Sequence, residues 1–465
     1  MPETSQHEKE KEQDRVASEL SSPTNFDGIA SSFDTVERQA DRHLVRKIDS
    51  RLLPILTLLY LLSFLDRSDL NLSAPAYNTS LALYFVAYVL FEVPANNSAR
   101  LKRFDPQVWL PTLTLIWGIV SVCQGLVTNQ AGLFGIRFLL GATEAGLFPG
   151  VIYLFSQALP ICLFKVTMAH GILAFAIGKM EGIGGRRGWQ WIFILEGLLT
   201  IIISLLAYFV VPTWSYQAKF LDESERERLL FRLDNDTDPA HKEPFQWFYV
   251  KQAFTDHLVW GYALLFHGYA FALYSLTLFM PTIITELGFQ SWQAQLLTVP
   301  PNTLAALSIA FTVWLSIRCD RRAVFIIIAA AVAILAGAQY VGVHLAAAGV
   351  YTGNALLLSW PGENVAGQTK RAVAVAMQIT FGDIGAIAGV LIYRPNFVGH
   401  EYRKPHIIAI GYLLFSIAVA SYLQFWLAHE NKKKDALASS KSIETWAKSN
   451  RQRLGDHHIR YRYVY

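Results

Sequence analysis

The chain has 465 residues, of which 53% are hydrophobic, 13% aromatic and 16% charged, and its formal net charge is +4. Ordinary soluble domains carry more charge and less apolar surface, so the mean hydropathy of +0.30 excludes that class and indicates a membrane protein. The basic residues lie beside apolar runs, so the net positive charge does not indicate binding to nucleic acid. The three cysteines, Cys123, Cys162 and Cys319, predict neither a disulfide framework nor a metal site.

The N-terminal segment, residues 1–47, is polar and carries charges of both signs. It lacks the apolar core of a cleavable signal peptide, so we expect the first apolar run to act as the insertion signal. We interpret residues 1–47 as a disordered cytoplasmic tail.

Apolar runs of roughly the ~20-residue length that crosses a bilayer as a helix recur along most of the chain. They do not alternate as the strands of a membrane barrel would. We therefore predict an all-α polytopic membrane protein with twelve transmembrane helices in two six-helix halves, residues 48–212 and 258–428. The predicted spans lie near residues 50–70, 79–96, 108–127, 131–156, 159–178, 188–211, 258–284, 293–317, 323–338, 341–361, 371–393 and 405–428.

Two polar segments complete the predicted organisation. Residues 213–257 form a central cytoplasmic loop, in which LDESERERLLFRLDND predicts a short amphipathic helix with Asp222 and Glu225 as a capping box. Residues 429–465 form a basic cytoplasmic tail, which we expect to be disordered.

The distribution of lysine and arginine in short loops predicts the orientation in the membrane. With twelve spans, five basic clusters fall on one side, which places both termini in the cytoplasm. Two further loops carry basic residues on the opposite side. The five agreeing clusters are Arg42–Arg51, Arg100–Arg103, Arg318–Arg322, Lys370–Arg371 and Lys432–Lys434; the two exceptions are Lys179–Arg187 and Arg394–Lys404.

Similar basic clusters follow the second span and the eighth, its counterpart if the two halves are a duplication. Paired six-helix halves around a central site are the arrangement of an alternating-access transporter. Each cluster also contains an aspartate, which can latch the loop to a neighbouring helix. Topology alone also explains the clusters, and both interpretations stay open. The candidate gating residues are Arg100, Arg103 and Asp105 after the second span, and Asp320, Arg321 and Arg322 after the eighth.

The stretch RFLLGATEAGLFPG places two ionisable groups inside an apolar run. Arg137, Gly141 and Glu144 share one face of a helix, and the two charges lie about 10 Å apart along it. They are too distant to pair directly, and an unpaired charge near the bilayer centre is costly. We expect Arg137 to pair with Asp66, and Glu144 to pair with Arg67 or to bind a proton; a role as structural pins also stays open.

Several segments in the same order resemble the fungal anion:cation symporters of the major facilitator superfamily, the group of the allantoate and nicotinate permeases. They are LPILTLLYLLSFLDRSDLN, the arginine stretch above, GWQWIFILEG, FMPTIITELGF, QLLTVPP and NVAGQTKRAVAVAMQITFGDIGAIAG, and the similarity covers about residues 47–427. The resemblance implies proton-coupled import of a small organic anion, such as nicotinate, allantoate or a similar vitamin, by a monomer in the plasma membrane. It implies no cofactor beyond the proton and no enzymatic activity.

A symporter of anions needs a cation that attracts the substrate and a carboxyl group whose proton affinity responds to its surroundings. Tyrosines within the spans can stack on a flat substrate ring. Asp383 stands where the family motif often has asparagine, which is a departure that adds an acid. The candidate substrate-binding residues are Arg67, Arg137, Tyr84, Tyr88, Tyr269 and Gln378, and the candidate proton-coupling residues are Asp66, Glu92, Glu144 and Asp383.

The chain also departs from the family by omission. The first external loop is short, the fifth span carries Lys165 and His170 where the family is rich in glycine and alanine, and residues 323–361 leave almost no loop between two spans. An incomplete gene model or a degenerate relative would produce this pattern. The alternative to transport is therefore a nutrient sensor or a transport-inactive relative, while a membrane enzyme lacks the clustered nucleophile and base that it would need.

Overall fold

The computed structural model describes residues 74–98, 106–145, 180, 182–210, 221–228, 246–335, 340–392, 403–438, 456 and 461–465, with four isolated positions between residues 43 and 50. The chain divides into two compact units, residues 1–52 and 53–465, and every helix below belongs to the second unit. The described residues form helices and no strands, which confirms the all-α prediction.

One group of helices comes from the N-terminal part of this unit. It contains α3 (Ala74–Ser98), α4 (Pro106–Leu126), α5 (Gln130–Glu144) and α8 (Gly188–Val210), and we call it the N-terminal group. A single helical turn, η1 (Ile183–Gly185), precedes α8. These helices occupy the predicted second, third, fourth and sixth spans, while the predicted first and fifth spans lie outside the described residues.

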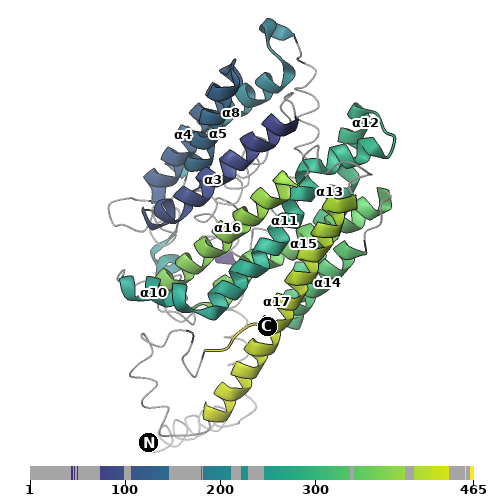
Figure 1. Cartoon of the computed structure of the whole chain (residues 1–465). Coiled ribbons are helices and arrows are strands. Elements are labelled where there is room, and N and C mark those ends of the chain that lie inside the picture. Colours follow the sequence, from purple (N-terminus) through teal and green to yellow (C-terminus); the bar gives the residue numbers. More distant parts are fainter. Residues whose placement is uncertain are drawn as a thin grey trace, which may run out of the picture. The chain divides into compact units, whose positions relative to one another are not determined.

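The remaining long helices make up the C-terminal group. They are α11 (His257–Glu286), α13 (Val299–Cys319), α14 (Arg322–Ile334), α15 (Tyr340–Asn364), α16 (Gln368–Leu391) and α17 (Arg403–Ala438). Figure 1 shows the two groups, with α16 beside α3 of the N-terminal group. Among the described residues, six helices are long and apolar enough to cross a membrane: α8, α11, α13, α15, α16 and α17.

The predicted eighth span, residues 293–317, is divided into two helices. A short helix, α12 (Ser291–Leu296), precedes α13, which begins at Val299. Pro300 and Pro301 follow at the start of α13. Proline has no backbone N–H to donate, so it suits the first turn of a helix, and the start of α13 fits the sequence QLLTVPP.

Residues 322–364 supply both α14 and α15, as the short spacing predicts. The 13 residues of α14 extend only about 20 Å at 1.5 Å per residue, less than the hydrocarbon thickness of about 30 Å. The 25-residue α15 has the full length. Of these two helices, only α14 is therefore shorter than the hydrocarbon core.

The central polar stretch contains more structure than predicted. A helix begins after Asp222, whose N–H donates to the Glu225 carboxylate at 3.0 Å, which is one of the two hydrogen bonds of the predicted capping box. A second helix, α10 (Trp247–Thr255), precedes α11 and was not predicted. Val250 and Ala253 of α10 are buried with Val373 and Met377 of α16, so burial against another helix stabilises this segment.

Helix α16 packs closely on α11 because glycines line the contact. A Cβ atom added at Gly385 would collide with the carbonyl of His267, and one at Gly389 would lie 2.7 Å from the carbonyl of Phe271. This close approach explains the glycines of the motif GDIGAIAG, because membrane helices come this close only where small residues line the contact.

Helix α5 approaches α3 in the same way. A Cβ atom at Gly141 would collide with the Tyr84 carbonyl and would lie 3.2 Å from the Ala87 Cβ. Gly135, on the same helix, has nothing within 4 Å of the corresponding position. The missing side chain of Gly141 therefore allows α5 to approach α3 closely.

The end of the chain differs from the prediction of a disordered tail. Helix α17 continues to Ala438, well past the predicted end of the last span at residue 428. The side chains of Asp456, Tyr461 and Tyr463 are buried. The prediction is wrong for these residues because partners on other helices, invisible in the local composition, hold them in place.

Gly141 lies in the contact between α5 and α3 and Gly135 does not, so a comparison of the two positions tests this contact. We expect Gly141→Ala to destabilise the protein by about 1–3 kcal/mol, because overpacking against backbone forces α3 and α5 apart. Gly135→Ala should be neutral or slightly stabilising, since alanine favours helix by about 1 kcal/mol over glycine. Thermal unfolding of the detergent-solubilised variants measures both, and equal effects would contradict this packing.

Candidate functional site

Three polar residues lie along one face of α3. Tyr84, Tyr88 and Glu92 are spaced four residues apart, so they stack on one side of the helix, and all three are buried. Tyr88 lies within electrostatic range of Glu92, Asp383, Tyr84 and Glu144. The predicted tyrosines and acids of α3, α5 and α16 thus come together in one cluster, which we call the carboxyl cluster.

Glu144 of α5 belongs to this cluster through Tyr84. The Tyr84 hydroxyl donates to the Glu144 carboxylate at 2.5 Å, and both side chains are buried. Gly141, one turn before Glu144, allows the close approach of α5 to α3 that brings these groups together. Sequence analysis named both residues but assigned the tyrosine to substrate stacking and did not predict the hydrogen bond.

Glu92 connects the two groups of helices. The Thr380 hydroxyl of α16 donates to the Glu92 carboxylate at 2.8 Å, and Asp383, one turn further along α16, interacts electrostatically with Glu92. Asp383 is only 5% exposed. Sequence analysis missed Thr380, although its position one turn before Asp383 in the motif QITFGD is a signal that could have identified it.

Aromatic rings extend the contact between the groups. Phe85 of α3 and Tyr274 of α11 meet edge to face, with ring centroids 4.9 Å apart. Tyr84 and Tyr88 lie with their centroids 6.0 Å apart. The carboxyl cluster therefore sits beside aromatic side chains from both groups.

Arg137 is fully buried on the same helix as Glu144. Its guanidinium lies over the ring of Phe193 of α8, 5.3 Å from the centroid. Glu196, another buried acid, follows Phe193 by one turn on α8, so the arginine lies beside the helix face that carries this carboxylate. Sequence analysis overlooked Glu196, which stands in the quoted segment GWQWIFILEG.

Tyr269 and Gln378 have partners away from the carboxyl cluster. The Tyr269 hydroxyl donates to the Ile326 carbonyl of α14 at 2.6 Å. The Gln378 amide donates to the Leu357 carbonyl of α15 at 2.9 Å. These bonds connect helices within the C-terminal group, and the structure does not bring Tyr269 into the cluster.

The second predicted gating cluster contains a latch, but with a different carboxylate. Arg322, the first residue of α14, contacts Glu363 and Ser359 at the end of α15. Asp320 instead caps α13 with a left-handed backbone (φ 52°), and its side chain and that of Arg321 are exposed. The prediction of an aspartate latch is corrected in this respect, because the turn that Asp320 makes directs Arg322 onto α15.

Several predicted residues lie outside the described part of the chain: Asp66, Arg67, Arg100, Arg103 and Asp105. The predicted pairings of Arg137 with Asp66 and of Glu144 with Arg67 therefore stay predictions. Within the described residues, no group of three or more His, Cys, Asp or Glu side chains is placed to hold a metal ion.

The cluster combines acids that can gain or lose a proton with a contact that depends on their charge. A hydroxyl donates a stronger hydrogen bond to an ionised carboxylate than to a neutral acid. Glu92 and Asp383 are both buried and interact electrostatically, and like charges in apolar surroundings repel each other. Proton exchange at this point would therefore change how firmly α3 and α16 are joined.

Comparisons with known proteins identify the family of the chain. Residues 51–390 match the family profile of the Major Facilitator Superfamily. An uncharacterized transporter of Schizosaccharomyces pombe is 30% identical over 462 residues, which cover 90% of each chain. The high-affinity nicotinic acid transporter of Saccharomyces cerevisiae is 28% identical over 500 residues, covering 99% of this chain and 91% of its own.

A solved structure shares the fold. The bacterial homolog of the human lysosomal transporter Spinster, in an inward-facing and unoccupied conformation, gives a TM-score of 0.57 at 16% identity, covering 81% of this chain and 97% of its own. The buried carboxyl cluster between two helix groups, the family match and this shared fold lead to one conclusion: the chain is a multi-pass membrane protein of the Major Facilitator Superfamily.

Proposed function

We propose that this chain is a proton-coupled importer of a small organic anion, with nicotinate as the first candidate and allantoate or a similar carboxylate as the next. It acts by alternating access in the plasma membrane, with both termini in the cytoplasm. The observation that carries the proposal is the hydrogen bond from Thr380 to Glu92, because it joins a proton-binding group to the contact between the two helix groups.

The coupling step uses the charge of Glu92. While Glu92 is ionised, the Thr380 hydroxyl donates to a full negative charge and holds α16 against α3. Binding of a proton weakens this bond and removes the repulsion between Glu92 and Asp383. A proton therefore loosens the contact that must change when the halves of an alternating-access transporter rock.

The anion needs a positive partner, and Arg137 supplies it in this proposal. Arg137 and Glu144 lie two turns apart on α5, so an anion near the arginine acts on a helix that also reaches the carboxyl cluster through Tyr84. Negative charge arriving there favours protonation of the nearby acids. Substrate and proton then bind together, as symport requires.

The similarity to the nicotinic acid transporter of Saccharomyces cerevisiae supports the choice of substrate class and membrane. A flat aromatic carboxylate also suits a site bordered by Tyr84, Tyr88 and Phe85.

The direct test is uptake of labelled nicotinate and allantoate by cells that lack their own permeases, with surface protein quantified. We expect accumulation of one of these anions that is faster at about pH 5 than at about pH 7, because the carboxyl cluster must bind a proton, and that collapses with a protonophore. Normal surface protein with no uptake of either anion would contradict the proposal and favour a sensor or an inactive relative.

Glu92→Gln tests the coupling acid. Glutamine preserves the shape and still accepts from Thr380 but cannot titrate, so we expect acid stimulation and uphill accumulation to disappear while exchange of labelled for unlabelled anion continues. Glu223→Gln, which changes an exposed acid of the central polar stretch outside the carboxyl cluster, is the control and should retain acid stimulation per surface molecule. Equal pH profiles for wild type and Glu92→Gln would contradict the assignment.

Tyr84→Phe removes one hydroxyl and keeps the ring. The lost hydrogen bond to a buried carboxylate is worth about 1.5–3 kcal/mol, so we expect coupled uptake to fall roughly tenfold or more at an unchanged surface level. Tyr351→Phe removes a comparable buried hydroxyl, which bonds Thr277 within the C-terminal group, and should leave uptake close to wild type. The measurement is the initial rate of uptake, and a normal rate for Tyr84→Phe would exclude a role for this bond in transport.

A further inference from the structure

The last residues of the chain occupy a site formed by the ends of three helices. Asp456 and residues 461–465, which we call the C-terminal strap, contact the end of α15, the start of α16 and the end of α17. Nothing in the proposed transport cycle uses them. Their contacts have the character of a specific peptide-binding site.

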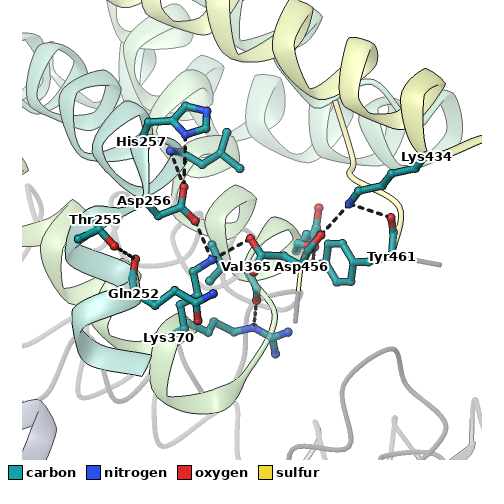
Figure 2. A network of polar contacts seen from close by, with 12 residues as sticks. Gln252, Thr255, Asp256, His257, Val365, Lys370, Lys434, Asp456 and Tyr461 are labelled. Carbon is teal, nitrogen blue, oxygen red and sulfur yellow. Dashed lines mark hydrogen bonds and ion pairs between the residues drawn. The ribbon is translucent and has the colours of Figure 1, made fainter. Parts of the chain in front are cut away.

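A buried charge network anchors the first residue of the strap. Figure 2 shows Lys370 between two aspartates: its ammonium lies 2.6 Å from Asp256 at the α10–α11 junction, and 2.7 Å from Asp456. Lys434 of α17 donates to the Asp456 carbonyl at 2.7 Å and to the Tyr461 carbonyl at 3.3 Å. All four charged side chains are less than 10% exposed, so two cations and two anions are buried together.

Two asparagines hold the strap backbone. Asn364 of α15 accepts from the Val464 N–H at 2.7 Å and donates to the Val464 carbonyl at 2.8 Å. Asn431 of α17 makes the same pair of bonds with Tyr463, at 2.9 Å and 2.8 Å. In a β-sheet, an extended peptide makes such a pair of hydrogen bonds with a neighbouring strand. Here each amide side chain makes them instead.

Aromatic residues complete the site. The Trp360 indole N–H donates to the Val464 carbonyl at 2.8 Å, and the Tyr461 hydroxyl donates to the Glu363 carbonyl at 2.6 Å. The Lys434 ammonium lies over the ring of Tyr463, 3.9 Å from its centroid. Burial raises the pKa of the Tyr463 phenol, so this ring docks in its neutral form.

The groups that hold the strap are themselves buried and polar. If the strap left, Trp360, Asn364 and Lys434 would lose these bonds in surroundings where an unsatisfied polar group is costly. The strap belongs to the same chain as its site, so its docking is intramolecular and its effective concentration at the site is high. The site is therefore built for an extended peptide, and its occupant is the end of this chain.

The strap also holds the helix that carries the coupling residues. Lys370 stands at the start of α16, which carries Thr380 and Asp383 further along. Rocking of a transporter half requires its helices to move as one body. We propose that the C-terminal strap is a detachable latch on the cytoplasmic side of the proposed orientation: docked, it ties α16 to α15 and α17 and permits coupled transport; detached, it lets α16 move alone and slows transport. Its effect on transport rests on the proposed function.

The docking itself can be tested on the full-length protein without any substrate. We expect backbone amides of residues 461–465 to exchange with deuterium at least roughly tenfold more slowly than in a free peptide of residues 456–465. Asn431→Ala should accelerate exchange at Tyr463, while Ser421→Ala, an exposed change on the same helix, should not. Exchange in the wild type at the rate of the free peptide would overturn the proposal.

A second measurement uses a chain that ends at Gly455, checked for a single peak in gel filtration. A fluorescent peptide of residues 456–465 should bind it, as measured by fluorescence anisotropy, and should bind full-length protein much more weakly because the strap already occupies the site. The Asp456→Asn peptide should bind roughly tenfold more weakly, since it loses the buried ion pair with Lys370. Equal binding to both proteins would overturn the proposal, and a truncated chain that does not fold leaves the exchange measurement to decide.

The effect of the strap on transport is measured only if the wild type takes up the anion. Truncation at Gly455 should lower the initial uptake rate per surface molecule several-fold. The peptide of residues 456–465, supplied on the side of the membrane where the strap docks, should restore this rate. Specific peptide binding with unchanged uptake would overturn the regulatory role. Absence of uptake in the wild type would instead refute the proposed function, while the exchange and binding measurements would still report on the strap.

Discussion

A charge or hydrogen-bonding group buried in apolar surroundings needs a partner, and this constraint determines where the polar residues of the chain lie. Glu144 accepts from Tyr84, Glu92 accepts from Thr380, and Lys370 lies between two aspartates. Each of these contacts joins different helices, so satisfying a buried group also positions one helix against another. The carboxyl cluster and the C-terminal strap are two results of the same requirement.

Close helix packing makes these pairings possible. Gly141 brings α5 near enough to α3 for Glu144 to reach Tyr84, and the glycines of GDIGAIAG bring α16 onto α11. In a membrane, where apolar burial gives little net attraction between helices, small residues and polar contacts supply the specificity. The glycines therefore serve the site indirectly, by setting the distances at which the carboxylates meet their donors.

The carboxyl cluster and the strap act on the same helix. Thr380 and Asp383 of α16 face the N-terminal group, while Lys370 at its start is held by the strap. One helix therefore carries both contacts. The Arg322 latch, which ties α14 to α15, adds a second fixed point in the same group.

Local patterns in the sequence determined which segments form helices and which residues are costly to bury. The apolar runs predicted the described spans, and the spacing of Arg137 and Glu144 predicted a shared face. These features depend on neighbours a few residues apart, which is the range over which helix periodicity and backbone geometry act.

The partners of the buried groups were decided by the tertiary structure. The predicted latch lies on Asp320 and the predicted tail is disordered, whereas Arg322 contacts Glu363 and Asp456 is buried beside Lys370. Glu92 and Thr380 are 288 positions apart, and Tyr84 and Glu144 are 60 apart. No periodicity spans such separations, so these contacts follow only from how the helices pack.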